Sequence, residues 1–214
     1  MASGLRLNLT AWPAAFLALA ALSALLFAHD AVRGPAAAWA PGLEWRADSL
    51  WSEPWRLLSA ALVHHDLRHL AANLAGCAAV ALFGWAGRLP WRATLAAALA
   101  WPLTHAALLW APGLARYGGL SGVLHAAVAV AALHLLLHER GRARLIGALV
   151  WGGLVAKVLT EAPWRSAVQT QPGWDFPIAV GAHAAGLICG TVVMMGLAGL
   201  TGQASARQRS RARQ

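Results

Sequence analysis

The chain has 214 residues, of which 59% are hydrophobic and 12% are charged, and its formal net charge is +9. This composition excludes an ordinary soluble domain and is typical of a polytopic membrane protein. The charge does not indicate a nucleic-acid partner, because the basic residues lie between apolar segments and at the C-terminal end, without interleaved aromatic residues. No CxxC, HExxH or phosphate-binding Gly-Lys motif occurs, so we expect neither a metal nor another cofactor.

Six apolar segments follow one another along the chain, each near the ~20 residues that a helix needs to span a bilayer. They cover residues 12–28, 70–86, 93–111, 123–137, 145–159 and 178–200, and the fourth and fifth are short. The first has full bilayer length and no convincing cleavage site after it, so we expect a retained helix rather than a signal peptide. The sequence predicts an all-α membrane protein, with a six-helix domain over residues 1–200 and a basic, disordered cytoplasmic tail over 201–214.

The connection between the first two predicted spans, roughly residues 29–67, is long and rich in tryptophan. It contains Trp39, Trp45, Trp51 and Trp55. Tryptophan is enriched where a membrane meets water, so we expect this connection to lie in the membrane interface.

The arginines predict the orientation in the membrane. Ten of them lie in alternate connections and terminal segments: Arg6, Arg88, Arg92, Arg140, Arg142, Arg144, Arg207, Arg209, Arg211 and Arg213. The other six are spread over longer connections: Arg33, Arg46, Arg56, Arg68, Arg116 and Arg165. Because short cytoplasmic connections carry an excess of basic residues, both termini are expected in the cytoplasm, and a bacterial inner membrane is the expected location.

Polar residues inside spans are costly and normally face a partner or a water-filled cavity. Those near the predicted outer face are His64, His65, His69, Asn73, Ser121 and His183. At helical spacing, His65, His69 and Asn73 share one face of the second span. We interpret His64 and His65 as interfacial residues, with His64 as a secondary site candidate, whereas His69 with Asn73 is harder to explain without a function.

The fourth and sixth spans combine polar side chains with small residues. The fourth begins GGLSG, which surrounds Ser121 with Gly118, Gly119 and Gly122. The sixth reads GAHAAGLICG, in which Ala182, Gly186 and Gly190 recur every four residues beside His183. Such surfaces let two helices approach closely, so we expect the Ser121 hydroxyl and the His183 imidazole to come within hydrogen-bonding reach. The alternative is a serine that only bonds to its own helical turn.

A serine next to an imidazole base is the minimum arrangement for nucleophilic catalysis, and a third acidic group is not obligatory. The backbone N–H of Ser121, the Asn73 amide and the His69 imidazole would supply oxyanion donors. With the N-terminus inside, the second, fourth and sixth spans all start at the outer face, so His69, Ser121 and His183 share one depth. For the remaining histidines, His29, His105, His125, His134 and His138, we expect structural roles, and for Lys157 a side chain that reaches to the interface.

Several motifs together resemble the rhomboid intramembrane serine proteases. They are GLSG at residues 119–122, AHxxGxxxG at 182–190, His69 with Asn73, the earlier histidine His64, and WRLLS from Trp55. The resemblance covers nearly the whole chain with the motifs in the expected order. It implies a six-helix rhomboid bundle, a Ser121–His183 dyad open to the outer face, and an oxyanion site using His69 and Asn73. The segment LEWRADSLWSEPWR does not align residue by residue, so no role is assigned there.

Within that family, the compact size and the phrase YGGLSGVLH look most like the rhombosortase subgroup. This likeness implies membrane-anchored protein substrates that end in a Gly-Gly motif, a transmembrane helix and a basic tail. Three alternatives stay open: a general rhomboid protease, a catalytically inactive rhomboid-fold scaffold or chaperone, and an unrelated transporter. A transporter predicts inverted repeats and spans broken near mid-membrane, and the sequence has neither.

Overall fold

The structure is a computed structural model that describes residues 2–170 and 177–211, with side chains for 10–170 and 177–199. The described residues form mainly helices: α1 (Ala2–Arg33), α2 (Ala40–Leu43), α3 (Arg56–Ser59), α4 (Leu67–Ala86), α5 (Trp91–Ala107), α6 (Ser121–His138), α7 (Gly141–Glu161) and α8 (Val180–Arg211). Three short 3-10 helices, Pro35–Ala37, Ala60–Leu62 and Leu108–Trp110, lie in the connections. Strands β1 (Trp45–Arg46) and β2 (Arg116–Tyr117) form an antiparallel pair.

Six helices are long and apolar enough to cross a membrane, so the protein is a multi-pass integral membrane protein, as predicted. Their spans are Thr10–Arg33, Leu67–Ala86, Trp91–Trp110, Ser121–His138, Gly141–Glu161 and Val180–Gly199. The fourth and fifth, with 18 and 21 residues, are longer than predicted, because polar and charged residues continue both helices beyond their apolar stretches. Helix α8 continues to Arg211, past the predicted domain boundary at residue 200, and the disorder of the tail stays a prediction.

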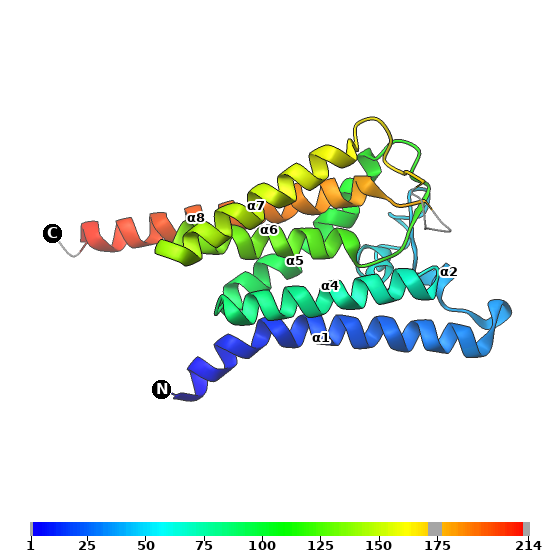
Figure 1. Ribbon diagram of the computed structural model, residues 1–214, viewed down its shortest axis with the longest axis horizontal. Helices are drawn as coiled ribbons and strands as arrows, with labels where there is room; N and C mark the ends of the chain where they lie inside the picture. The colour runs from blue at the N-terminus through cyan, green and yellow to red at the C-terminus, as the bar shows by residue number, and fades with distance from the viewer. Residues whose placement is uncertain (1, 171–176, 212–214) are drawn as a thin grey trace.

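Helix α6 lies at the centre of the bundle. Figure 1 shows α1 and α4 along one edge and α7 and α8 along the other, and α6 packs against α4, α5, α7 and α8. Its alanine-rich sequence lets neighbours approach from several sides, and 61% of its span is buried, compared with 11% for α7. The helix that starts at Ser121 is therefore the most enclosed of the six spans.

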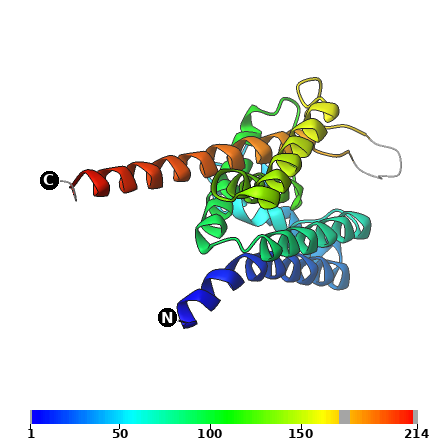
Figure 2. The same ribbon diagram turned by 60° about the vertical axis from the view of Figure 1, so that its left-hand side comes forward.

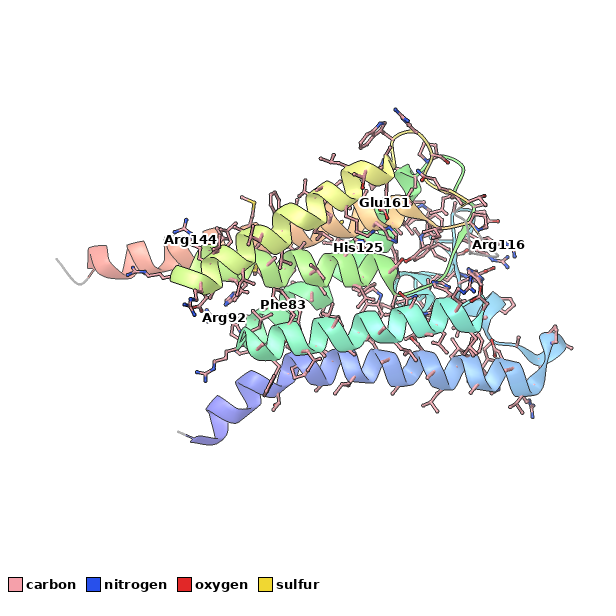
Figure 3. The ribbon with its side chains drawn as sticks, in the orientation of Figure 1. Phe83, Arg92, Arg116, His125, Arg144 and Glu161 are labelled. Carbon is pink, nitrogen blue, oxygen red and sulfur yellow. The ribbon has the colours of Figure 1, made fainter. Side chains whose placement is uncertain are left out.

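The two ends of the bundle differ in charge. Both chain termini lie at one end, and the second view agrees (Figures 1 and 2). Arg92 and Arg144 lie at this same end, whereas Arg116 lies at the opposite end (Figure 3). The alternation that the arginines predict is therefore present in the fold, and the cytoplasmic location of this end stays a prediction.

The connection between α1 and α4 is folded against the opposite end. Strand β1 pairs with β2, so that Trp45 lies opposite Tyr117, and Trp45 is fully buried. The buried Arg56 guanidinium donates to the carbonyl oxygen of Glu44 at 2.6 Å and to the Glu53 carboxylate at 2.7 Å. The other three tryptophans of this connection, Trp39, Trp51 and Trp55, are exposed, and their position in the membrane interface stays a prediction. This folded connection anchors the segment that leads into α6.

Candidate active site

Ser121 is the first residue of α6, and the backbone conformation of Gly119, two positions earlier, determines where this residue lies. Gly119 has φ of +131°, a conformation that side chains rarely adopt, and its N–H donates to the Ala60 carbonyl oxygen at 2.9 Å. A Cβ atom on Gly119 would lie 2.6 Å from Nε2 of His69. Only glycine therefore lets the chain turn into α6 this close to the His69 ring.

The Ser121 hydroxyl has one weak contact, to Tyr117. The two oxygens are 3.5 Å apart, and the Tyr117 hydroxyl donates its proton to the Gly119 carbonyl at 2.8 Å. Burial raises the pKa of the Tyr117 hydroxyl, so the group stays protonated. Because a hydroxyl has only one proton, Ser121 must be the donor in any bond with Tyr117. Among the described residues no backbone carbonyl accepts from Ser121, which argues against a serine bonded to its own turn.

Helices α6 and α8 touch at their glycines, directly beside the predicted pair. A Cβ atom on Gly122 would lie 3.0 Å from the carbonyl oxygen of Ala182. Side chains at Gly186 and Gly190 would collide with the backbone of Gly122 and Ala126. The immediate neighbours of Ser121 and His183 are therefore in contact across this interface.

A chain of contacts connects Ser121 to His183 through His125. His125 Nδ1 donates to the Ser121 carbonyl oxygen at 2.6 Å, and its ring stacks on His183 with centroids 4.1 Å apart and an angle of 9° between the planes. In the part of the chain that the structure describes, no hydrogen bond joins the Ser121 hydroxyl directly to His183. Catalytic contacts of this kind are often long without substrate and tighten in the complex.

On its other side, His183 contacts the C-terminal end of α7. His183 is 6% exposed, and its Nδ1 lies 2.9 Å and 3.1 Å from the two carboxylate oxygens of Glu161. The Lys157 ammonium donates to the same carboxylate at 2.6 Å. Figure 3 shows His125 and Glu161 at the same end of the bundle. Lys157 is thus paired with Glu161 across one helical turn, and its reach to the membrane interface stays a prediction.

His69 and Asn73 approach the site from α4. Asp66 caps this helix by accepting from the backbone N–H of His69 at 2.7 Å, which fixes where the helix starts. Asn73 is 5% exposed, its Nδ2 would lie 3.6 Å from a Cβ on Gly119, and this amide has no hydrogen-bond partner among the described residues. A buried amide donor without a partner next to the Ser121 segment is suited to hold a substrate oxygen.

His64 is buried against the His69 ring, whereas His65 is exposed, and an interfacial position for the two residues stays a prediction. His64 Nδ1 donates to the Leu62 carbonyl oxygen at 3.0 Å. Burial lowers the pKa of His64 to about 4, so the ring is neutral near pH 7 and its Nε2 carries a lone pair. In this form His64 has no second N–H to donate, so it is not suited to stabilise an oxyanion.

Two residues at this site were not among the sequence candidates. For His125 the sequence predicts only a structural role, although it stands four residues after Ser121 and so shares its helix face. For Glu161 the one signal in the sequence is a carboxylate four residues after Lys157 at the end of a span. His105 fits its expected structural role, because it is fully buried and donates to the Leu57 carbonyl oxygen at 2.6 Å.

Comparison with other proteins adds no assignment to this geometry. No family model matches the chain, and no curated protein matches it. Within the described residues, no group of three His, Cys, Asp or Glu side chains is arranged to hold a metal ion. Any function must therefore be argued from the side chains of the site itself.

Proposed function

We propose that the protein is an intramembrane serine protease of the rhomboid type, with Ser121 as nucleophile and His183 as general base. One observation carries the proposal: a serine hydroxyl and a buried imidazole lie on facing helices whose glycines are in contact, opposite an unpartnered buried amide. The Asn73 amide supports the proposal through its position, because a donor beside the Ser121 segment can hold a developing oxyanion.

The residues fit each step of acyl transfer. His183 would take the Ser121 hydroxyl proton as the oxygen bonds to the scissile carbonyl carbon. The resulting oxyanion would accept hydrogen bonds from the Ser121 N–H, the Asn73 amide and His69. Collapse breaks the C–N bond, and the departing amine takes the proton from His183. Water or a second amine then releases the acyl group by the same steps in reverse.

The proposed substrates are membrane-anchored proteins that are cut near the outer face, with both termini of the enzyme in the cytoplasm of a bacterial cell. A substrate segment must leave its helix to be cut, since helical carbonyls are already hydrogen-bonded. Gly-Gly favours this unwinding, because glycine is roughly 1 kcal/mol per residue less favourable in a helix than alanine. For this reason we propose substrates of the rhombosortase kind, ending in Gly-Gly, an apolar helix and a basic tail.

The test is co-expression with a reporter that carries such a C-terminal signal, compared with the same reporter bearing Leu-Leu in place of Gly-Gly. We expect a fragment released on the outer side from the Gly-Gly reporter and a steep loss of release with Leu-Leu, and the fragment mass identifies the acceptor. Equal release would leave a general rhomboid protease. No release from either reporter would count against proteolysis of such substrates and favour a rhomboid-fold scaffold.

A further inference from the structure

We infer that Glu161 is a positioning residue that fixes the tautomer and the ring orientation of His183, with Lys157 as its counter-ion. The catalytic unit then has three members, Ser121, His183 and Glu161, instead of the two of a dyad. This inference rests on the proposed function and adds to it a third helix, α7, that takes part in the chemistry.

The tautomer follows from the chemistry of the carboxylate. An ionised carboxylate only accepts hydrogen bonds, and both oxygens of Glu161 lie within 3.1 Å of His183 Nδ1. Nδ1 must therefore carry a proton, which leaves the lone pair of a neutral ring on Nε2. A lone pair on Nε2 is the form that takes a proton from a serine.

Glu161 is itself held in place. Its carbonyl oxygen accepts from the Gln169 side-chain amide at 2.6 Å. The next residue, Ala162, has φ of +46° and ψ of +56°, a left-handed conformation that ends α7 directly after Glu161. With the backbone fixed on one side and Lys157 bonded to one carboxylate oxygen, the side chain has little freedom to leave His183.

The groups that face His183 come from two helices. From α7, the Glu161 carboxylate lies at 2.9 Å and the Lys157 ammonium at 3.4 Å from Nδ1, and from α6 the His125 ring stacks on the imidazole. The carboxylate is negative and the ammonium is positive, and both lie on the Nδ1 side of the ring. The two charges therefore act on the same ring in opposite directions, which gives the inference a directional test.

The experiment compares Glu161→Gln and Lys157→Met with the unaltered protein and with Glu139→Gln, a matched carboxyl-to-amide control at an exposed position at the other end of the bundle. Ser121 labelling by a serine-directed fluorophosphonate and reporter cleavage are each measured from pH 5 to 9. We expect Glu161→Gln to lower the rate roughly 10²–10⁴-fold and to move the acidic limb of the rate profile to lower pH. Lys157→Met should move that limb to higher pH with a smaller loss, and Glu139→Gln should change neither.

The inference would be overturned if the acidic limb of the rate profile did not move, or if it moved in the same direction in both variants. Glu161 would then serve only to hold α7 against α8. Lys157→Met leaves the Glu161 carboxylate and its backbone anchor to Gln169 in place, so it gives a result even if Glu161→Gln fails to accumulate. Labelling of the unaltered protein separates the two proposals. If Ser121 reacts in that protein but the limbs stay fixed, only the positioning role fails, whereas an unreactive Ser121 refutes the proposed function.

Discussion

The two ends of the bundle treat polar groups in opposite ways. At the end with both termini, the arginines of the short connections are exposed: Arg88, Arg92, Arg140, Arg142 and Arg144. At the other end lie all the buried polar or charged side chains of the described residues except Ser23: Glu44, Arg56, His64, His69, Asn73, Thr104, His105 and His183. Solvated charge orients a membrane protein at little cost, whereas buried polar groups are costly unless they are paired or have a function.

The buried set itself divides in two. Arg56 and His105 Nδ1 donate to backbone carbonyl oxygens, and these bonds tie the α1–α4 connection to the bundle. Around Ser121, in contrast, the Asn73 amide lacks a partner and His183 carries a carboxylate from another helix. The experiments below test whether this second group serves catalysis.

The largest effect is expected from the pair itself. Ser121→Ala and His183→Ala should each abolish reporter cleavage, because a serine hydroxyl without its base is a poor nucleophile. The double variant should be no worse than either single variant, since such residues act as a unit. Both proteins should still accumulate in the membrane, as checked by immunoblot of membrane fractions, and additive losses would argue against one catalytic unit.

Gly186→Leu should inactivate by a different route. A side chain there meets the Gly122 carbonyl oxygen, so α8 must move away from α6 and take His183 with it. The matched control is Gly196→Leu on the same helix, where a Cβ would meet nothing within 4 Å. Cleavage should be lost in the first and kept in the second. Loss in both would show that the packing of α6 on α8 is not the cause.

Asn73→Ala should lower kcat by roughly 10²–10³-fold without abolishing turnover, because other donors still face the oxyanion. The removed amide has no partner among the described residues, so the variant protein should be no less stable than the original. Thermal unfolding in detergent measures the second effect. A stable protein with full activity would make Asn73 a packing residue, and a less stable one would mean that its amide is bonded within the fold.

The smallest effect is expected at the end of the bundle that carries both termini. Replacing the exposed Arg92 and Arg144 together with glutamine should change cleavage per inserted molecule by less than about twofold, since both lie at the end remote from Glu161 (Figure 3). Any change should appear in the fraction of molecules with the predicted orientation, measured by protease accessibility of a terminal tag. A large loss of turnover in correctly oriented molecules would contradict the division between the two ends.

The six spans could be predicted from sequence because apolar length alone determines them, and their ends were less predictable where polar residues such as Ser121 continue a helix. The contact of α6 with α8 follows from glycines spaced at four residues. The partnership of Glu161 with His183 could not be predicted, because it depends on how α7 packs, and the four-residue spacing from Lys157 already offers Glu161 a local partner. His125 has a signal in its four-residue spacing from Ser121. Spacing alone, however, does not distinguish a ring that stacks on His183 from a ring that only fills space in the core.

The most direct test of the central claim is the site of reaction with a serine-directed fluorophosphonate, located by peptide mass spectrometry in purified protein. We expect the adduct on Ser121 and on no other serine, since activation requires a base and oxyanion donors around one hydroxyl. His183→Ala should prevent the adduct although Ser121 is still present. Labelling of Ser121 that is equally fast without His183, or no labelling of the unaltered protein at any pH between 5 and 9, would contradict the account.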